Sequence, residues 1–315
     1  MNVLSLFDGM SCGQIALERA RIKVDNYFAS EIDKYAIKVT QANYPNTIQL
    51  GDVTKIKGED LPKIDLLMGG SPCQGFSFAG KRLNFDDPRS KLFFEFIRLL
   101  EETKPKYFLL ENVKMKKSSQ DIISSYLSCE PIEINSNLVS AQNRRRLYWT
   151  NIPNIEQPED LNIKLKDILL DQGICFHNVY RGFKEKNARI FVDKSPTIRT
   201  ACGGGHIPSL LLSQKALKYM DRTIKDRRTH WDFKHHSDIK NNKSSAVVAN
   251  FFKGVPYNVL KTRNLIRYFH PIECERLQTV PDNYTAYVSN TQRYKMLGNG
   301  WTVNVIAHIL KHIKE

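Results

Sequence analysis

The sequence has no long apolar run and no paired cysteines. No apolar run reaches the roughly 18 residues that a membrane-spanning helix needs, so we expect no membrane partner. Residues 1–8 carry no basic side chain and end on Asp8, so a signal peptide is not expected either. The six cysteines stand singly without a C-x-x-C pair, which argues against a zinc site and a disulfide framework. These absences favour a reducing, cytoplasmic location and a protein without a bound metal.

Internal repeats and low-complexity tracts are also missing. The chain has 315 residues, of which 41% are hydrophobic and 25% are charged. This composition is ordinary for a globular protein and excludes wholesale disorder, collagen-like repeats and coiled coil. The length suits one large domain, or a large domain with a smaller one.

The positive charge is concentrated in one part of the chain. The net charge is +14, yet residues 1–180 hold 23 basic and 23 acidic residues. Residues 181–263 hold 18 basic and 6 acidic residues, and residues 264–315 hold 6 and 4. A localised basic segment indicates a polyanionic partner, with an uneven solvated surface as the alternative.

Short apolar runs alternate with helical patterns through the first half of the chain. This alternation predicts a doubly wound, mostly parallel sheet covered by helices on both faces, an α/β fold. In such sheets, ligands bind at the carboxyl ends of the strands. The predicted strands cover residues 3–6, 27–30, 64–68, 107–110 and 147–150, and the predicted helices cover residues 13–21, 34–43, 92–102 and 118–127.

The regular pattern breaks near a connection rich in proline and asparagine at residues 151–160. It returns after residue 265, where apolar residues at helical spacing predict that the carboxyl terminus packs back on the sheet. We therefore predict a catalytic and cofactor-binding domain of residues 1–153 plus 265–315. A smaller, irregular domain of residues 154–264 lies between its two parts.

Three features at predicted strand ends suit a nucleoside cofactor. The turn from Asp8 to Gly13 joins the first strand to the first helix and brings glycine to a helix amino terminus. Glu31 ends the second strand, where a carboxylate suits ribose hydroxyls. Asp52 follows the third strand region, where it could accept a hydrogen bond from an adenine amino group.

Cys73 follows a predicted strand within the glycine-rich sequence Gly-Gly-Ser-Pro-Cys-Gln. A cysteine at this place is positioned like a nucleophile, although an isolated cysteine is more often buried and inert. The tract of residues 75–91 is long for a loop, and long loops beside a reactive residue are often lids.

Glu111 ends the neighbouring predicted strand and could face Cys73 in one pocket. In the sequence Gln-Asn-Arg-Arg-Arg, an extended backbone would turn Arg144 and Arg146 to one side and Arg145 to the other. Two guanidinium groups on one face suit a phosphate or a carbonyl oxygen, and a basic surface strand is the alternative.

Together these segments resemble the DNA cytosine-5 methyltransferase family. The resemblance covers residues 1–151 and about 265–315. Its most specific parts are Pro-Cys-Gln at residues 72–74, Glu-Asn-Val at 111–113 and Gln-x-Arg-x-Arg at 142–146. Further matching segments are Phe-Asp-Gly at 7–9, Glu-Ile-Asp at 31–33, Gly-Asp-Val at 51–53, the segment from His270 to Arg276, and Gly-Asn-Gly at 298–300.

The resemblance implies an S-adenosylmethionine-dependent methyltransferase fold, in which the smaller domain of residues 154–264 is the target-recognition domain. It also implies S-adenosylmethionine as the cofactor and a set of residues lining its site. Ser11-Cys12, where many bacterial members have a second glycine, and Trp301, where the family usually has valine, depart from the pattern. We therefore expect altered cofactor contacts with binding retained. The implied cofactor residues are Phe7, Asp8, Gly9, Gly13, Glu31, Ile32, Asp52, Val53, Pro72, Leu92, Asn299 and Trp301.

The resemblance also implies the chemistry, in which the methyl group goes to C5 of a cytosine flipped out of a specific duplex sequence. The Cys73 thiolate would add to C6 of the base, Glu111 would bind N3 and the amino group, and Arg146 with Arg144 would hold O2 and nearby phosphate. The expected DNA-binding residues are Gln74, Ser77, Lys81, Arg82, Arg89, Arg199, Gly203, Gly204, Arg222, Arg227 and Arg228.

We therefore expect a monomeric modification enzyme of a restriction-modification system, whose partner nuclease shares the target sequence without forming a stable complex. A tRNA cytosine-5 methyltransferase is one alternative, although Cys175-Phe176 is followed by His177, where that branch typically has threonine. A catalytically inactive DNA-binding homologue is another. An amino-methyltransferase is disfavoured because the chain has no Pro-Pro pair.

Overall fold

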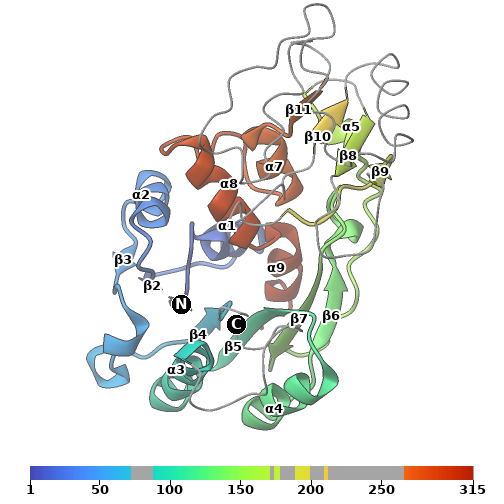
Figure 1. Cartoon of the computed structure of the whole chain (residues 1–315). Coiled ribbons are helices and arrows are strands. Elements are labelled where there is room, and N and C mark those ends of the chain that lie inside the picture. The colour runs from blue at the N-terminus through green and yellow to red at the C-terminus, as the bar shows by residue number, and fades with distance from the viewer. Residues whose placement is uncertain (72–87, 171–173, 178–188, 199–208, 212–265, 315) are drawn as a thin grey trace, which may run out of the picture.

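Seven strands form the main sheet of the molecule (Figure 1). The computed structural model describes residues 1–71, 88–170, 174–177, 189–198, 209–211 and 266–314. The sheet order is β3-β2-β1-β4-β5-β7-β6, and only β7 runs antiparallel to its neighbours. Its strands are β1 (Asn2–Leu6), β2 (Asn26–Ser30), β3 (Ile48–Gln49), β4 (Leu66–Gly69), β5 (Tyr107–Val113), β6 (Ile132–Asn135) and β7 (Arg145–Thr150).

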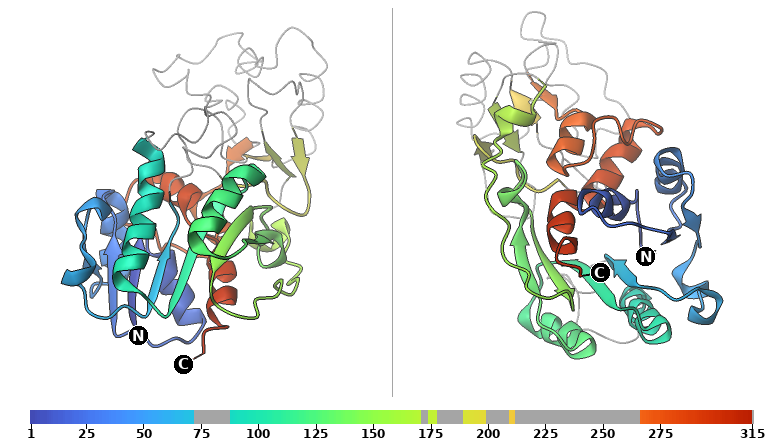
Figure 2. Two further views of the ribbon diagram at one scale, coloured as in Figure 1. Left: turned by 90° about the horizontal axis from the view of Figure 1, so that it is seen from below. Right: turned by 180° about the vertical axis from the view of Figure 1, so that it is seen from behind.

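Helices cover both faces of this sheet because its strands are apolar on both sides. In β1, Val3 packs into a core with helices α1 and α9, whereas Leu4 and Leu6 pack into a second core with α3 and α4. Figure 2 shows α3 and α4 side by side on one face. The helices are α1 (Cys12–Arg19), α2 (Lys34–Asn43), α3 (Pro88–Thr103), α4 (Lys117–Leu127), α5 (Leu165–Ile168), α7 (Pro271–Leu277), α8 (Asn290–Asn299) and α9 (Val303–Leu310).

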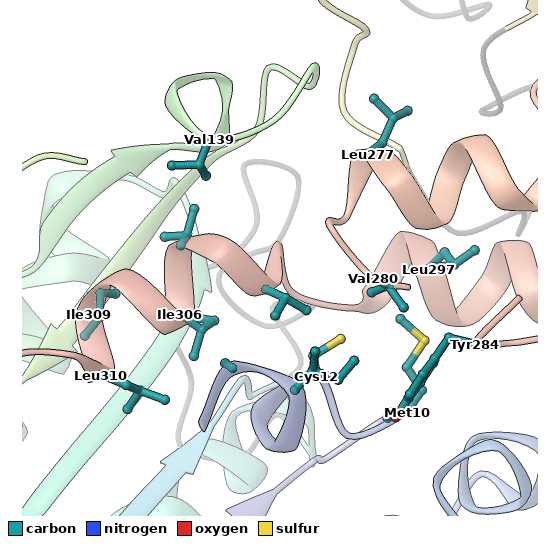
Figure 3. Close-up of a cluster of buried hydrophobic side chains, with 14 of the residues drawn as sticks. Met10, Cys12, Val139, Leu277, Val280, Tyr284, Leu297, Ile306, Ile309 and Leu310 are labelled. Carbon is teal, nitrogen blue, oxygen red and sulfur yellow. Dashed lines mark hydrogen bonds between the residues drawn. The ribbon is translucent and has the colours of Figure 1, made fainter. Parts of the chain in front are cut away.

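The carboxyl-terminal helices return to the start of the chain, as predicted. Figure 3 shows Ile306, Ile309 and Leu310 of α9 in the buried cluster that also contains Cys12 of α1. The Tyr284 hydroxyl donates a hydrogen bond to the carbonyl oxygen of Met10 over 2.8 Å. Segments from the two ends of the chain thus form one core beside the first βα turn.

A second, antiparallel sheet lies at one end of the molecule, opposite the two termini (Figures 1 and 2). Its order is β11-β10-β8-β9, formed by β8 (Ile174–His177), β9 (Arg189–Phe191), β10 (Ser209–Leu211) and β11 (Ile266–Tyr268). Strand β11 therefore joins this smaller sheet, although it lies just beyond the predicted domain edge at residue 264. The predicted domain boundaries stay predictions.

The predicted elements are present, with shifted ends. The helix over residues 34–43 agrees with its prediction, and the Asp33 side chain caps it by accepting a hydrogen bond from the Tyr35 N–H. Strand β5 continues to Val113, three residues beyond the prediction, because those residues pair with β7. Within the described segments, no helix is both long and apolar enough to cross a membrane.

Candidate active site

The predicted chemistry-bearing residues gather at the carboxyl ends of parallel strands. β1, β2, β4 and β5 run in the same direction, so the residues at these ends share one edge of the sheet. Phe7 follows β1, Glu31 follows β2 and Ser71 lies shortly after β4, whereas Glu111 lies inside β5. This edge therefore carries both the expected cofactor residues and the expected catalytic carboxylate.

The Glu31 carboxylate is held in place by backbone donors. The Gly9 N–H donates to Oε2 over 2.8 Å, and the N–H groups of Ile32 and Asp33 donate to Oε1, each over 2.8 Å. A carboxylate fixed by three amides is a pre-oriented acceptor for hydroxyl groups. Ile32 beside it is 76% exposed, an unusual state for a large apolar side chain.

The turn after β1 adopts a left-handed backbone at three residues. Phe7, Gly9 and Ser11 have φ angles of 56°, 61° and 59°. Such angles are strained for non-glycine residues and cluster at functional sites. The turn therefore holds its backbone in a fixed, uncommon shape at the amino terminus of α1.

Asp8 lies within this turn, and its carboxyl group is bound by hydroxyls. Tyr27 donates to Asp8 Oδ1 over 2.7 Å, and the Ser11 hydroxyl donates to Oδ2. Burial raises the pKa of Asp8 to about 6, despite these hydrogen bonds. Asp8 therefore links the turn to Tyr27 on β2 and to Ser11 at the start of α1. A Cβ atom at Gly13 would lie 2.6 Å from Met68 Cε and 2.7 Å from the Tyr27 hydroxyl, so a larger residue there would force these two side chains to shift.

Asp52 lies three residues beyond β3, at the amino end of the short 3-10 helix η1 (Val53–Lys55). Its carboxylate accepts hydrogen bonds from the N–H and hydroxyl of Thr54 over 3.0 and 2.9 Å, which lowers its pKa. The Ser30 hydroxyl donates to the Gly51 carbonyl over 2.8 Å, so the segments that carry Glu31 and Asp52 are linked. Of the other expected cofactor residues, Val53 is buried, Leu92 and Trp301 are partly buried, and Asn299 is exposed.

Glu111 is buried, with 8% of its surface exposed. Arg146 on β7 pairs with it, with 2.9 Å between Nε and Oε1. The register explains the contact, because Arg146 lies opposite Val113 and is therefore a diagonal neighbour of Glu111 on the same face. Trp301 donates from its indole Nε1 to the other carboxylate oxygen over 3.2 Å.

Arg144 and Arg146 have different surroundings. The Arg144 guanidinium is buried, and burial lowers its pKa to about 9. It donates to the carbonyl oxygens of Ile198, Gly298 and Gly300 over 2.9–3.4 Å. Arg144 thus joins three segments of the chain, and Arg146 is the member of the pair that contacts Glu111.

One contact that sequence reasoning missed ties Glu111 to the segment before Cys73. Asn112 Nδ2 lies 3.3 Å from the Ser71 hydroxyl and 3.5 Å from its carbonyl oxygen, and both residues are buried. The signal in the sequence was that Asn112 adjoins Glu111 and Ser71 adjoins Pro72. The last described residue before Pro-Cys is therefore held next to the catalytic candidate on β5.

The described cysteines do not compete for the role of nucleophile. Burial raises the pKa of Cys12 to about 12 and also raises the pKa values of Cys129 and Cys274. Thiols of this kind carry little thiolate near neutral pH. In the described part of the chain, no cluster of three or more His, Cys, Asp or Glu side chains could hold a metal ion.

Several predicted site residues lie outside the described residues or have no described side chain. Those outside are Cys73, Pro72, Gln74, Ser77, Lys81, Arg82, Arg199, Gly203, Gly204, Arg222, Arg227 and Arg228. Arg89 lies in the first turn of α3 without a described side chain. Their roles stay predictions.

Comparisons with known proteins agree with the resemblance. A family model described as C-5 cytosine-specific DNA methylase matches residues 1–315. The type II methyltransferase M1.ScrFI of Lactococcus lactis subsp. cremoris is 32% identical over 333 residues, covering 99% of this chain and 78% of that protein. The type II methyltransferase M.HhaI of Haemophilus parahaemolyticus is 28% identical over 334 residues, covering 99% and 94%.

A solved structure agrees on the fold. The methyltransferase EhMeth of Entamoeba histolytica aligns with a TM-score of 0.66 at 17% identity, covering 99% of this chain and 97% of that one. The mostly parallel sheet with helices on both faces is therefore confirmed. Because the family model matches the whole chain, the chain belongs to the C-5 cytosine-specific DNA methylase family, and it is an enzyme.

Proposed function

We propose that this enzyme transfers a methyl group from S-adenosylmethionine to C5 of a cytosine in a specific short sequence of duplex DNA. The main support for this proposal is the set of contacts around Glu111. Its carboxylate pairs with Arg146 over 2.9 Å, and its neighbour Asn112 contacts Ser71, two residues before Cys73. This arrangement brings the acid, a guanidinium and the start of the Pro-Cys segment to one edge of the sheet.

The residues after β1 and β2 fit S-adenosylmethionine. The fixed Glu31 carboxylate would accept hydrogen bonds from the two ribose hydroxyls, and the exposed Ile32 side chain would lie against the adenine. Asp52 would accept from the adenine amino group, and the strained turn from Phe7 to Ser11 would face the amino-acid part. When bound, the cofactor supplies an electrophilic methyl group on its sulfonium sulfur.

Cys73 makes C5 of the base reactive. Its thiolate forms a bond to C6, and the electron pair of the C5–C6 double bond shifts into the ring, so that C5 becomes a nucleophile. After C5 takes the methyl group, loss of the C5 proton to a base and breakage of the sulfur–C6 bond restore the aromatic ring.

Glu111 and Arg146 stabilise the charge that this addition creates. In its protonated form, Glu111 donates a hydrogen bond to N3, where the added electron pair collects, and accepts one from the exocyclic amino group of the cytosine. Arg146 lies beside it to bind O2. Arg144 holds the loop between α8 and α9 and the segment at Ile198 in place, through its bonds to backbone carbonyls.

Access to C5 requires a flipped-out base, because an enzyme cannot reach this atom while the base is stacked inside the duplex. Residues 75–91 would close over the base, with Gln74, Ser77 and Arg82 filling the gap or contacting the backbone. Residues 154–264, with the net positive charge of residues 181–263, would bind and read the duplex.

The enzyme would act as a cytoplasmic monomer in a restriction-modification system. Two relatives that match nearly the whole chain are type II methyltransferases. Methylation of the shared target would protect DNA from a partner nuclease without a stable complex between the two enzymes.

Bisulfite sequencing of plasmid DNA tests this function. We expect methylated cytosines at one position of one short sequence when the purified protein and S-adenosylmethionine are present. The same protein is assayed with tRNA for methyl transfer. Transfer to tRNA without transfer to duplex DNA would show that the substrate is tRNA. Transfer to neither would indicate an inactive homologue.

A further inference from the structure

Trp301 and Arg146 contact different oxygens of the Glu111 carboxylate. Its indole Nε1 lies 3.2 Å from Oε2, whereas Arg146 Nε lies 2.9 Å from Oε1. Each carboxylate oxygen therefore has a donor of its own, one on β7 and one in the loop between α8 and α9.

The backbone around Trp301 is fixed on both sides. The Gly300 carbonyl accepts a hydrogen bond from Arg144 over 2.9 Å, and the Gly300 N–H donates to the Met296 carbonyl over 2.7 Å. The buried Thr302 hydroxyl bonds with Gln278 Oε1 over 2.9 Å. The indole thus projects toward Glu111 from a rigid point of the loop.

Gly70 leaves the space that this contact needs. A Cβ atom at residue 70 would lie 2.9 Å from Trp301 Nε1 and 3.1 Å from Glu111 Oε2. Any other residue there would press on both groups at once. The absence of a side chain at Gly70 therefore leaves room for the contact between the Trp301 indole and the Glu111 carboxylate.

A glutamate carboxyl group rotates easily about its last side-chain bond, because that torsion has a broad, shallow energy profile. One donor would leave the second oxygen free to swing, whereas two donors, one to each oxygen, fix the plane of the carboxyl group. Fixing this plane aligns the carboxyl group with the edge of the base before the base arrives.

We propose that Trp301 is a positioning residue for the reaction, and that its indole N–H orients Glu111 for the edge of the cytosine. The proposal rests on the function proposed above and deepens it. It differs from the expectation that Trp301 only lines the cofactor site, because a lining role needs the shape of the indole and not its N–H.

An isosteric replacement separates these two roles. Trp301 is replaced through an amber codon by 3-benzothienylalanine, whose ring has nearly the same shape but carries sulfur in place of N–H. We expect kcat on duplex DNA to fall roughly tenfold, as for loss of a hydrogen bond to a charged group. The Kd for S-adenosylmethionine, measured by calorimetry, should change by less than about twofold because the ring shape is kept.

Trp149 supplies the matched control. It is buried, and its Nε1 donates to the Ser124 hydroxyl over 3.0 Å, within the core against α4. The same replacement there removes an indole hydrogen bond away from Glu111 and should leave kcat unchanged. Trp301→Phe is the second variant should the replacement fold poorly, and it should show the same loss of kcat.

An unchanged kcat in both Trp301 variants, with an active wild type and an inactive Glu111→Gln, would overturn the positioning role alone. An equal loss of kcat in the Trp149 control would overturn it too. A wild type that transfers no methyl group to DNA would overturn the proposed function and this role with it.

Discussion

Glu111 is the described residue on which the proposed chemistry depends most. Its carboxylate lies 2.9 Å from Arg146, and both side chains are largely buried, where electrostatic interactions are strong. We predict that Glu111→Gln lowers kcat on duplex DNA by roughly 10²–10⁴-fold while DNA affinity is retained. Single-turnover methyl transfer and a gel-shift titration measure the two quantities, and a loss below about twofold would remove Glu111 from the mechanism.

Asp8 makes the stability of the turn after β1 depend on pH. Burial raises its pKa in the folded protein from 3.8 to about 6, so between these values the folded state binds more protons than the unfolded state. Stability from this group therefore increases as pH falls through 6. We predict that the free energy of unfolding of the wild type, relative to Asp8→Asn, rises by about 1 kcal/mol between pH 7 and pH 5.

Asp52 is the control for this measurement because its pKa is shifted in the opposite direction. Asp52→Asn should not reproduce the rise in denaturant titrations at the two pH values. An Asp8→Asn difference that is the same at pH 7 and pH 5 would contradict the partly buried, hydroxyl-bound state of Asp8.

At the scale of elements, local patterns predicted most helices and strands, and long-range pairing decided the remainder. The helix over residues 34–43 was predicted with its observed ends, and the structure adds that Asp33 caps its start. The end of β5 was not, because its last residues are extended through pairing with β7, a strand about 35 residues later. Glu111 therefore lies inside β5, whereas the predicted strand ended at residue 110.

The two arginines of the Gln-x-Arg-x-Arg motif show the same limit of local reasoning. The expected alternation agrees with the structure, since the Arg145 side chain is 63% exposed and that of Arg146 is 14% exposed. The carbonyl partners of Arg144 come from segments more than 50 residues away in the sequence. No pattern near residue 144 could indicate them.

We predict that Arg144→Ala destabilises the fold by about 2–4 kcal/mol, because several charge-assisted hydrogen bonds are lost in a buried place. Arg145→Ala is the matched control on the same strand, since its contact with Glu133 is on the surface. Urea titrations compare the two. Equal stabilities of both variants would show that Arg144 does not join these segments.

At the scale of the whole molecule, charge and chemistry occupy different parts of the chain. Residues 1–180 are neutral in sum, and residues 181–263 carry a net charge of +12. The catalytic candidates come from the neutral part, whereas the basic part falls in the predicted target-recognition domain. This division suits an enzyme that binds a polyanion with one region and reacts with a single base in another.

We predict that joint replacement of Arg222, Lys225, Arg227 and Arg228 by glutamine weakens DNA binding and flattens its salt dependence. Each lost phosphate contact lowers the slope of log K against log salt by about 0.9. Fluorescence anisotropy at several salt concentrations measures this slope. A slope equal to that of the wild type would contradict this prediction and would indicate that these four basic residues are an ordinary solvated surface.

Cys73 is the residue on which the central claim, cytosine C5 methylation through a thiolate adduct, can be tested most directly. The measurement is bisulfite sequencing of duplex DNA incubated with S-adenosylmethionine and either the wild type or Cys73→Ala. We predict methylated cytosines at one site with the wild type, none with Cys73→Ala, and retained DNA binding by the variant. Methylation by Cys73→Ala above background would contradict the account.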